Sequence, residues 1–156
     1  TLSAKAYDAA NNIGASTSIV VMVSNLKSAT IAFSSSSSNP ADKVGGFEIS
    51  FILPSGASIK TDTQGVPLSS SVYLTGSFLG STFGSQNLNF DPVSRTLTIS
   101  YPTSSSYDLG EFLTVVCEVP TSYTPNANDI TGLTYTFYAP NTGVVLNTIS
   151  VTKIFN

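Results

Sequence analysis

Apolar and polar residues alternate with a period of two along most of this chain, a pattern typical of β-strands with one buried and one exposed face. The clearest early case is residues 44–53, where Phe47, Ile49 and Phe51 fall on one face. By the same pattern we expect strands at residues 17–24, 28–34, 88–90, 95–101, 111–119, 131–138 and 144–154. No segment has a useful helical period, so the pattern predicts an all-β fold of about nine strands in two packed antiparallel sheets.

The segments between these strands carry turn-forming residues. The serine run at residues 34–38, followed by Asn39 and Pro40, predicts a flexible loop. Asp91 and Pro92 are typical of the first two positions of a type I turn, which predicts a hairpin. Residues 72–79 fit either a strand or a short helical turn, and residues 126–130 fit one helical turn.

The organisation indicates one domain over residues 1–156, because there is no fixed-period repeat and no linker that would divide the chain. We expect residues 17–156 to form the sandwich and residues 1–16 to form an N-terminal extension, as a donated strand or an edge strand. The longest apolar run, residues 19–23, is far shorter than the roughly 18–20 residues that cross a bilayer. We therefore expect no membrane span.

The composition is polar without being charged. Hydrophobic residues make up 41% of the chain and charged residues 10%, and serine and threonine together supply more than a quarter of it. The net charge is −3 and the six cations are scattered, which argues against nucleic-acid binding. The chain begins at Thr1, and we expect a processed protein that is secreted, extracellular or on the cell surface.

Groups that catalyse reactions are scarce. The chain has no histidine and one cysteine, which excludes a serine–histidine–aspartate triad and the usual ligands of structural zinc. Strand alternation places Cys117 on the inner face, so we expect a buried thiol; the alternative is a reactive thiol or an intermolecular disulfide. Asp108 and Glu111 are close in sequence, and Glu48 and Glu118 are candidate neighbours across a sheet. We favour solvated carboxylates, no catalytic residue, no enzyme and no cofactor.

Two kinds of ligand site have weaker candidates. Asn126, Asn128 and Asp129 offer oxygen atoms for calcium, although the same residues fit turns and helix caps. Three tyrosines fall in loops or at strand ends, where a ring either stacks on a sugar or anchors itself in the core. They are Tyr107, Tyr123 and Tyr138.

From residue 44 onward the order of strands and loops resembles a cohesin-type domain. The resemblance rests on residues 44–56 (VGGFEISFILPSG), 95–100 (RTLTIS) and 109–119 (LGEFLTVVCEV), then Asp129-Ile130 and a turn at residues 141–143. It covers residues 44–152 and implies a jelly-roll β-sandwich of about nine strands, related to carbohydrate-binding modules. Cohesins bind dockerin helices on one sheet face, but no contact residue can be carried over. Residues 1–43 depart from the pattern.

These observations favour a structural subunit over a receptor or an enzyme. We expect copies of the chain to assemble into a filament or layer through strand edges and the N-terminal segment. The alternative is a binding module, for a dockerin-like protein or for a glycan. The residues expected at the assembly contacts are Leu2, Ala4 and Ala6 near the start and Ile149, Val151 and Phe155 near the end.

Overall fold

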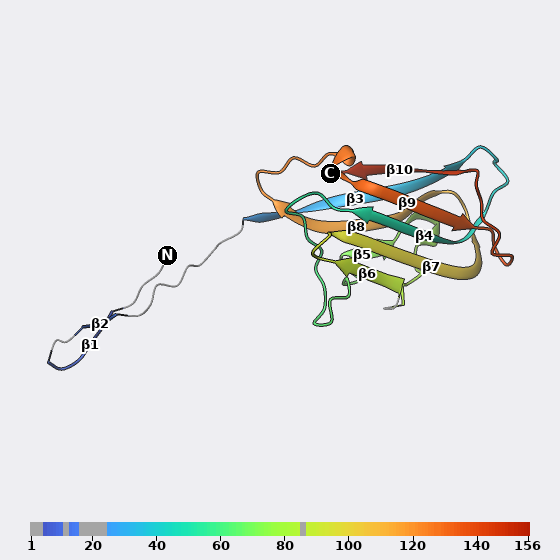
Figure 1. Cartoon of the computed structure of the whole chain (residues 1–156). Coiled ribbons are helices and arrows are strands. Elements are labelled where there is room, and N and C mark those ends of the chain that lie inside the picture. Colours follow the sequence, from blue (N-terminus) through green and yellow to red (C-terminus); the bar gives the residue numbers. More distant parts are fainter. Residues whose placement is uncertain (1–4, 11–12, 16–24, 85–86) are drawn as a thin grey trace.

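The computed structural model describes residues 5–10, 13–15, 25–84 and 87–156, which form ten strands and two short 3-10 turns (Figure 1). Eight of the strands form two antiparallel four-stranded sheets, which confirms the expected all-β sandwich. One sheet has the order β10-β3-β8-β5 and the other has the order β6-β7-β4-β9. The first contains β3 (Leu26–Ser37), β5 (Val72–Leu74), β8 (Gly110–Pro120) and β10 (Ile149–Phe155). The second contains β4 (Val44–Ile52), β6 (Leu88–Asp91), β7 (Thr96–Tyr107) and β9 (Thr131–Tyr138).

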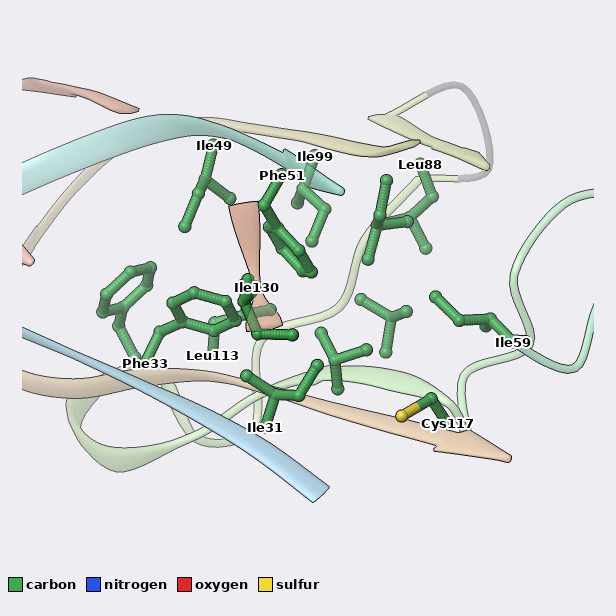
Figure 2. Packing of buried hydrophobic residues seen from close by; sticks show 14 of the residues in the cluster. Ile31, Phe33, Ile49, Phe51, Ile59, Leu88, Ile99, Leu113, Cys117 and Ile130 are labelled. Carbon is green, nitrogen blue, oxygen red and sulfur yellow. The ribbon is translucent and has the colours of Figure 1, made fainter. Parts of the chain in front are cut away.

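The hydrophobic core lies between the inner faces of the two sheets. Figure 2 shows Ile31, Phe33 and Leu113 of one sheet facing Ile49, Phe51 and Ile99 of the other. Each of these side chains is buried, as alternation predicts for strands that cover each other on one face. The predicted inner face of β8 is confirmed, because Leu113, Val115, Cys117 and Val119 are all buried.

Phe47 joins the aromatic part of the core. Its ring centroid lies 4.9 Å from that of Phe112 and 5.7 Å from that of Phe78, both in edge-to-face geometry. Phe112 is buried although alternation assigns it to the outer face. The β3–β8 register shifts between Phe33 and Ser34, and this bulge turns Phe112 inward beside Leu113.

The serine run is a strand, so the prediction of a loop at residues 34–38 is wrong for all but Ser38. Residues 34–37 complete β3 and pair with β10, through Ser36↔Ser150 and Ser37↔Ile149. Ser35 faces inward, 5% exposed, and its hydroxyl donates to the carbonyl oxygen of Gly110 at 3.2 Å. The ladder hydrogen bonds belong to the backbone, so small polar side chains do not prevent pairing.

The predicted hairpin turn and helical turns agree with the structure better than the loop predicted at residues 34–38 does. The Asp91 carboxylate accepts from the backbone N–H of Val93 at 2.9 Å and from the Ser94 hydroxyl at 2.6 Å, in the hairpin between β6 and β7. Arg95 completes the turn at φ 59. Residues 72–79 contain both predicted forms, strand β5 followed by the 3-10 turn η1 (Gly76–Phe78). A second 3-10 turn, η3 (Ala127–Asp129), confirms the helical turn expected there.

Two other strand predictions need comment. The strand expected over residues 144–154 begins only at Ile149, so its first half is wrong. Residues 139–143 make a turn with Asn141 at φ 62, and the N–H of Leu146 then donates to the carbonyl of Phe137 at 2.8 Å. Val145 thus makes an isolated bridge to Tyr138. The strand expected at residues 17–24 lies outside the described residues.

The N-terminal extension contributes to neither large sheet. Strand β1 (Lys5–Tyr7) pairs with β2 (Ile13–Ala15) in a two-stranded sheet of its own, with Ala6 opposite Gly14. Figure 1 shows this hairpin apart from the two large sheets.

Candidate functional site

Each sheet ends in two edge strands, and these meet on two sides of the sandwich. On one side β10 lies beside β9: the Lys153 ammonium on β10 donates to the carbonyl of Ile130, just before β9, at 2.6 Å. On the other side β5 and β6 border a common opening. An edge strand has one row of backbone groups outside its ladder, so both sides can pair with further chain.

The β10/β9 side is partly covered by its own chain. Ile149 and Phe155, two of the expected assembly residues, are buried in the core, and Val151 is half-buried against it. Lys153 also turns inward from the edge strand, a feature that discourages pairing between edges. The turn after β9 covers only the end of that strand, where Val145 bridges Tyr138 and the N–H of Leu146 donates to the carbonyl of Phe137 at 2.8 Å.

The β5/β6 side contains an apolar pocket of about 300 Å³. We call it the edge pocket and define it by six lining side chains from two loops and the two edge strands. They are Val66, Leu68, Val72, Leu74, Phe83 and Leu88. Val72, Leu74 and Leu88 are buried, whereas Leu68 is 38% exposed.

The charge in the edge pocket is already engaged. Of the described lining residues, Asp62 alone is charged. Its carboxylate accepts from the backbone N–H groups of Gln64 and Val66, both at 2.9 Å. The pocket therefore presents an apolar surface to an occupant.

Strand β5 leaves backbone groups beside this pocket. Tyr73 pairs with Thr114 of β8, and the ladder continues through Val116 N–H to the Ser71 carbonyl at 2.7 Å. Alternation in an antiparallel ladder then directs the peptide groups of Leu74 away from β8. The site thus combines an apolar recess with the backbone of a short edge strand.

The calcium candidates are held in a turn. The side-chain oxygen of Asn126 accepts from the N–H of Asn128 at 2.9 Å and caps η3, and the Asp129 carboxylate accepts from the Tyr123 hydroxyl at 2.5 Å. Burial, followed by the contact with Asp129, raises the pKa of Tyr123 to about 12. Within the described part of the chain, no three His, Cys, Asp or Glu residues gather in a way that could hold a metal.

The carboxylates do not form the pair considered from the sequence. Glu48 lies on β4 and Glu118 on β8, so they belong to different sheets and the suggestion that they are neighbours across one sheet is wrong. Glu118 instead pairs with Lys60 at 3.2 Å. Asp108 forms an ion pair with Lys43. Asp108 and Glu118 therefore each have a lysine as their partner.

A polar cluster around Asp42 has no signal in the sequence pattern. Its carboxylate accepts from the Ser37 hydroxyl at 2.6 Å, from the Asn39 amide at 2.7 Å and from the Thr148 hydroxyl. These hydrogen bonds, that of Ser37 first, lower the pKa of Asp42. The cluster ties the end of β3 to the chain just before β10.

Two of the candidate tyrosines pack against core residues, and the cysteine is buried in the core. Tyr107 stacks on Phe78 with ring centroids 4.1 Å apart, and Tyr123 lies 5.9 Å from Phe155. Both are half-buried, as expected of anchors whose hydroxyls remain near water. Cys117 is 1% exposed, which confirms the predicted burial, and desolvation raises its pKa to about 11.

Comparisons with protein-family models, curated proteins and solved structures find no match for this chain. The structure itself defines the class, an antiparallel β-sandwich with edge strands on two sides. None of the helices in the described segments has the length and apolar character to cross a membrane. Of the expected N-terminal assembly residues, Leu2 and Ala4 lie outside the described residues, and Ala6 lies in β1.

Proposed function

We propose that this chain is a non-catalytic structural subunit, secreted to the cell surface or beyond, whose copies assemble into a filament or layer through strand edges and the N-terminal segment. A cohesin-like jelly-roll kinship is part of this proposal. The partner is a second copy of the chain, and no cofactor or nucleic acid is required.

One observation carries the proposal: the N-terminal strands add to neither sheet of the sandwich. Strand β1 pairs with β2 alone, while both large sheets keep edge strands on two sides. A segment that does not complete its own fold is free to complete or bridge another copy, as in strand addition. Such a contact joins different surfaces of the two copies and therefore propagates as an open chain.

The direct test is deletion of residues 1–12 from the full chain, followed by negative-stain microscopy and sedimentation. We expect the intact chain to form filaments or sheets, and the trimmed chain to remain folded and monomeric. The trimmed protein keeps every strand of the two sheets, so its thermal unfolding is the control. Loss of the fold on trimming, or equal assembly of both chains, would contradict a role for this segment.

A binding module remains the second candidate, and the outer face of the β6-β7-β4-β9 sheet favours it. Ser50 lies between Thr98 and Thr134, and the Ser50 and Thr98 hydroxyl oxygens are 3.1 Å apart. Glu48 lies in the next row, and a shallow hollow of about 390 Å³ spans these strands. Hydroxyl groups at the strand spacing of about 4.8 Å suit an extended glycan with repeated hydroxyls.

Pull-down with insoluble cellulose and chitin tests this second candidate. If the sheet face binds glycan, we expect retention of the intact chain and reduced retention of Glu48→Gln and Thr98→Val. A matched control, Thr152→Val, changes an exposed residue of the other sheet and should bind normally. Equal retention of all four proteins, or none, would remove the glycan reading.

A further inference from the structure

We infer that a slot on the outer face of the β6-β7-β4-β9 sheet binds one ring of an uncharged sugar chain, between Pro102 and Tyr138 and above Gly46. We call it the ring slot and define it by these three residues, one each from β7, β9 and β4. The inference rests on the second candidate function, the glycan-binding module, and specifies its site. It does not depend on self-assembly, because the slot uses side chains on a sheet face and not the backbone groups of a strand edge.

The sheet register places the three residues of the ring slot in one row. Gly46 pairs with Pro102 on one side and with Tyr138 on the other. The next residues inward, Phe47 and Phe137, are buried in the core, so alternation directs the row to the outer face. Pro102 is exposed and Tyr138 is half-buried. Two side-chain rings therefore stand on either side of a residue that has no side chain.

The space between the two rings suits a single ring of a ligand. The backbones of β7 and β9 are two strand spacings apart, about 10 Å, with β4 between them. Side chains stand roughly perpendicular to a sheet, so the two rings have a similar separation. A ring in van der Waals contact on both faces needs about 7–8 Å, twice the contact distance between carbon atoms. Because Gly46 fills none of this space, a hollow of about 570 Å³ opens there.

Tyr138 is oriented by a charged neighbour in the next row. Its hydroxyl makes a hydrogen bond to the Glu48 carboxylate, which lies on the same face of β4. Desolvation, followed by the charge of Glu48, raises the pKa of Tyr138, so the phenol remains protonated at neutral pH and donates this bond. An ionised carboxylate accepts several hydrogen bonds. Glu48 can therefore hold the tyrosine ring and also accept from a ligand hydroxyl beside the slot.

Small polar residues surround the ring slot. Thr103 and Ser104 come from the irregular part of β7, where its register with β4 shifts, and Asn141 and Thr142 come from the turn after β9. The hollow of about 390 Å³ lies over the next rows of the same strands. Among the described residues that line the two hollows, Glu48 alone is charged.

This chemistry favours a sugar chain over a peptide. A neutral saccharide has apolar ring faces and hydroxyl groups around its edge, which matches two side-chain rings surrounded by hydroxyl and amide groups. An extended peptide would bind by adding a strand to a free sheet edge. The floor of the slot offers no such edge, because β4 is paired on both sides.

A printed array of uncharged and acidic oligosaccharides, followed by calorimetric titration of the best-bound compound, tests the inference on the full chain. We expect binding to uncharged oligosaccharides and none to acidic ones, because Glu48 would repel a carboxylate. Binding to acidic compounds alone would overturn the inference.

Variants of the two rings then test the slot itself. We expect Tyr138→Ala and Pro102→Ala each to weaken binding, by about tenfold for the tyrosine, whereas Tyr138→Phe keeps the ring and should lose less. The matched control is Tyr73→Ala, which removes a tyrosine that is 39% exposed on the other sheet and should bind as the intact chain does. Thermal unfolding checks that each variant is folded. If Tyr138→Ala is not, Pro102→Ala decides, because its side chain is exposed.

The outcomes separate the ring slot from the functions proposed above. Unchanged affinity in folded Tyr138→Ala or in Pro102→Ala would overturn the slot, because the ligand would then not lie between the two rings. If Thr98→Val alone weakened binding, the sugar would lie elsewhere on this sheet face, and the glycan-binding module would stand without the slot. Binding of the intact chain to no uncharged oligosaccharide would overturn both. None of these results bears on self-assembly, which the deletion of residues 1–12 tests separately.

Discussion

At the scale of single residues, glycine is required where another backbone comes close. Gly76 begins η1 at φ +58, and a Cβ atom there would lie 1.9 Å from the carbonyl oxygen of Glu111. The contact fixes the chain leaving β5 against β8, next to the edge pocket. Gly143 has a similar φ of +66, with nothing within 4 Å of the same built atom.

This pair gives a prediction about stability. We expect Gly143→Ala to cost about 1–2 kcal/mol, because only the left-handed backbone is penalised. Gly76→Ala should cost a further 1–3 kcal/mol, roughly, because the backbone at Glu111 must also move. Urea unfolding of both variants measures the difference, and equal losses would contradict the close approach.

A second prediction concerns Asp42 and pH. Its hydrogen bonds hold its pKa below the ordinary value of 3.8, so the folded state favours the ionised form. The stability that ionised Asp42 adds to the folded protein is fully present above the pKa of this carboxyl in the unfolded chain. It is lost as the pH falls through the lower pKa of the folded state. Asp42→Asn should therefore be less stable than the intact chain at pH 7 and equally stable well below pH 3.8. Thermal unfolding across this range checks it; a constant difference would exclude the charged contribution.

The thiol of Cys117 supplies a third prediction. Burial raises its pKa to about 11, so thiolate is scarce at neutral pH and the sulfur is shielded. We expect almost no reaction with a disulfide reagent at pH 8 in the folded protein, and one equivalent after denaturation. Rapid labelling of the native chain would instead indicate that β8 opens.

At the scale of elements, the C-terminal half of β3 shows what side-chain patterns miss. Four consecutive serines, residues 34–37, occupy a strand whose neighbours on both sides are β10 and β8. Alternation carries no information where both faces have small polar side chains. The pairing comes from backbone groups and from distant strands, so the local sequence does not encode it.

Proline substitution tests this strand. Ser36 is paired with Ser150, and the ladder position places its N–H in a hydrogen bond to β10. We expect Ser36→Pro to destabilise the fold by about 2–4 kcal/mol, since a donor is lost and an acceptor is left unpaired. Ser36→Thr keeps the N–H and should be close to neutral. Tolerance of proline would support the loop that the sequence suggested.

At the scale of the whole molecule, the sequence predicts layers better than sites. Strand faces and the buried position of Cys117 follow from alternation, because burial of one sheet face repeats every second residue. The inward turn of Phe112 does not, because it depends on a bulge against β3. The edge pocket combines loop residues such as Leu68 and Phe83 with two edge strands. No local pattern marks residues that meet only through the pairing of distant strands.

The arrangement of the whole molecule also bears on whether the chain is an assembling subunit or a binding module that acts alone. A sandwich with two open sides and an N-terminal hairpin outside both sheets has unpaired backbone to offer and an apolar recess to fill. A module that acts alone would instead present one of its sheet faces. The two accounts differ most in the mass of the protein in solution.

Light scattering of the intact chain over a wide range of concentration, coupled to size separation, is therefore the most direct test of self-assembly. The account predicts species that grow with concentration far beyond the 16.3 kDa of one chain, with masses at its multiples. A single species of 16.3 kDa at every concentration would contradict it.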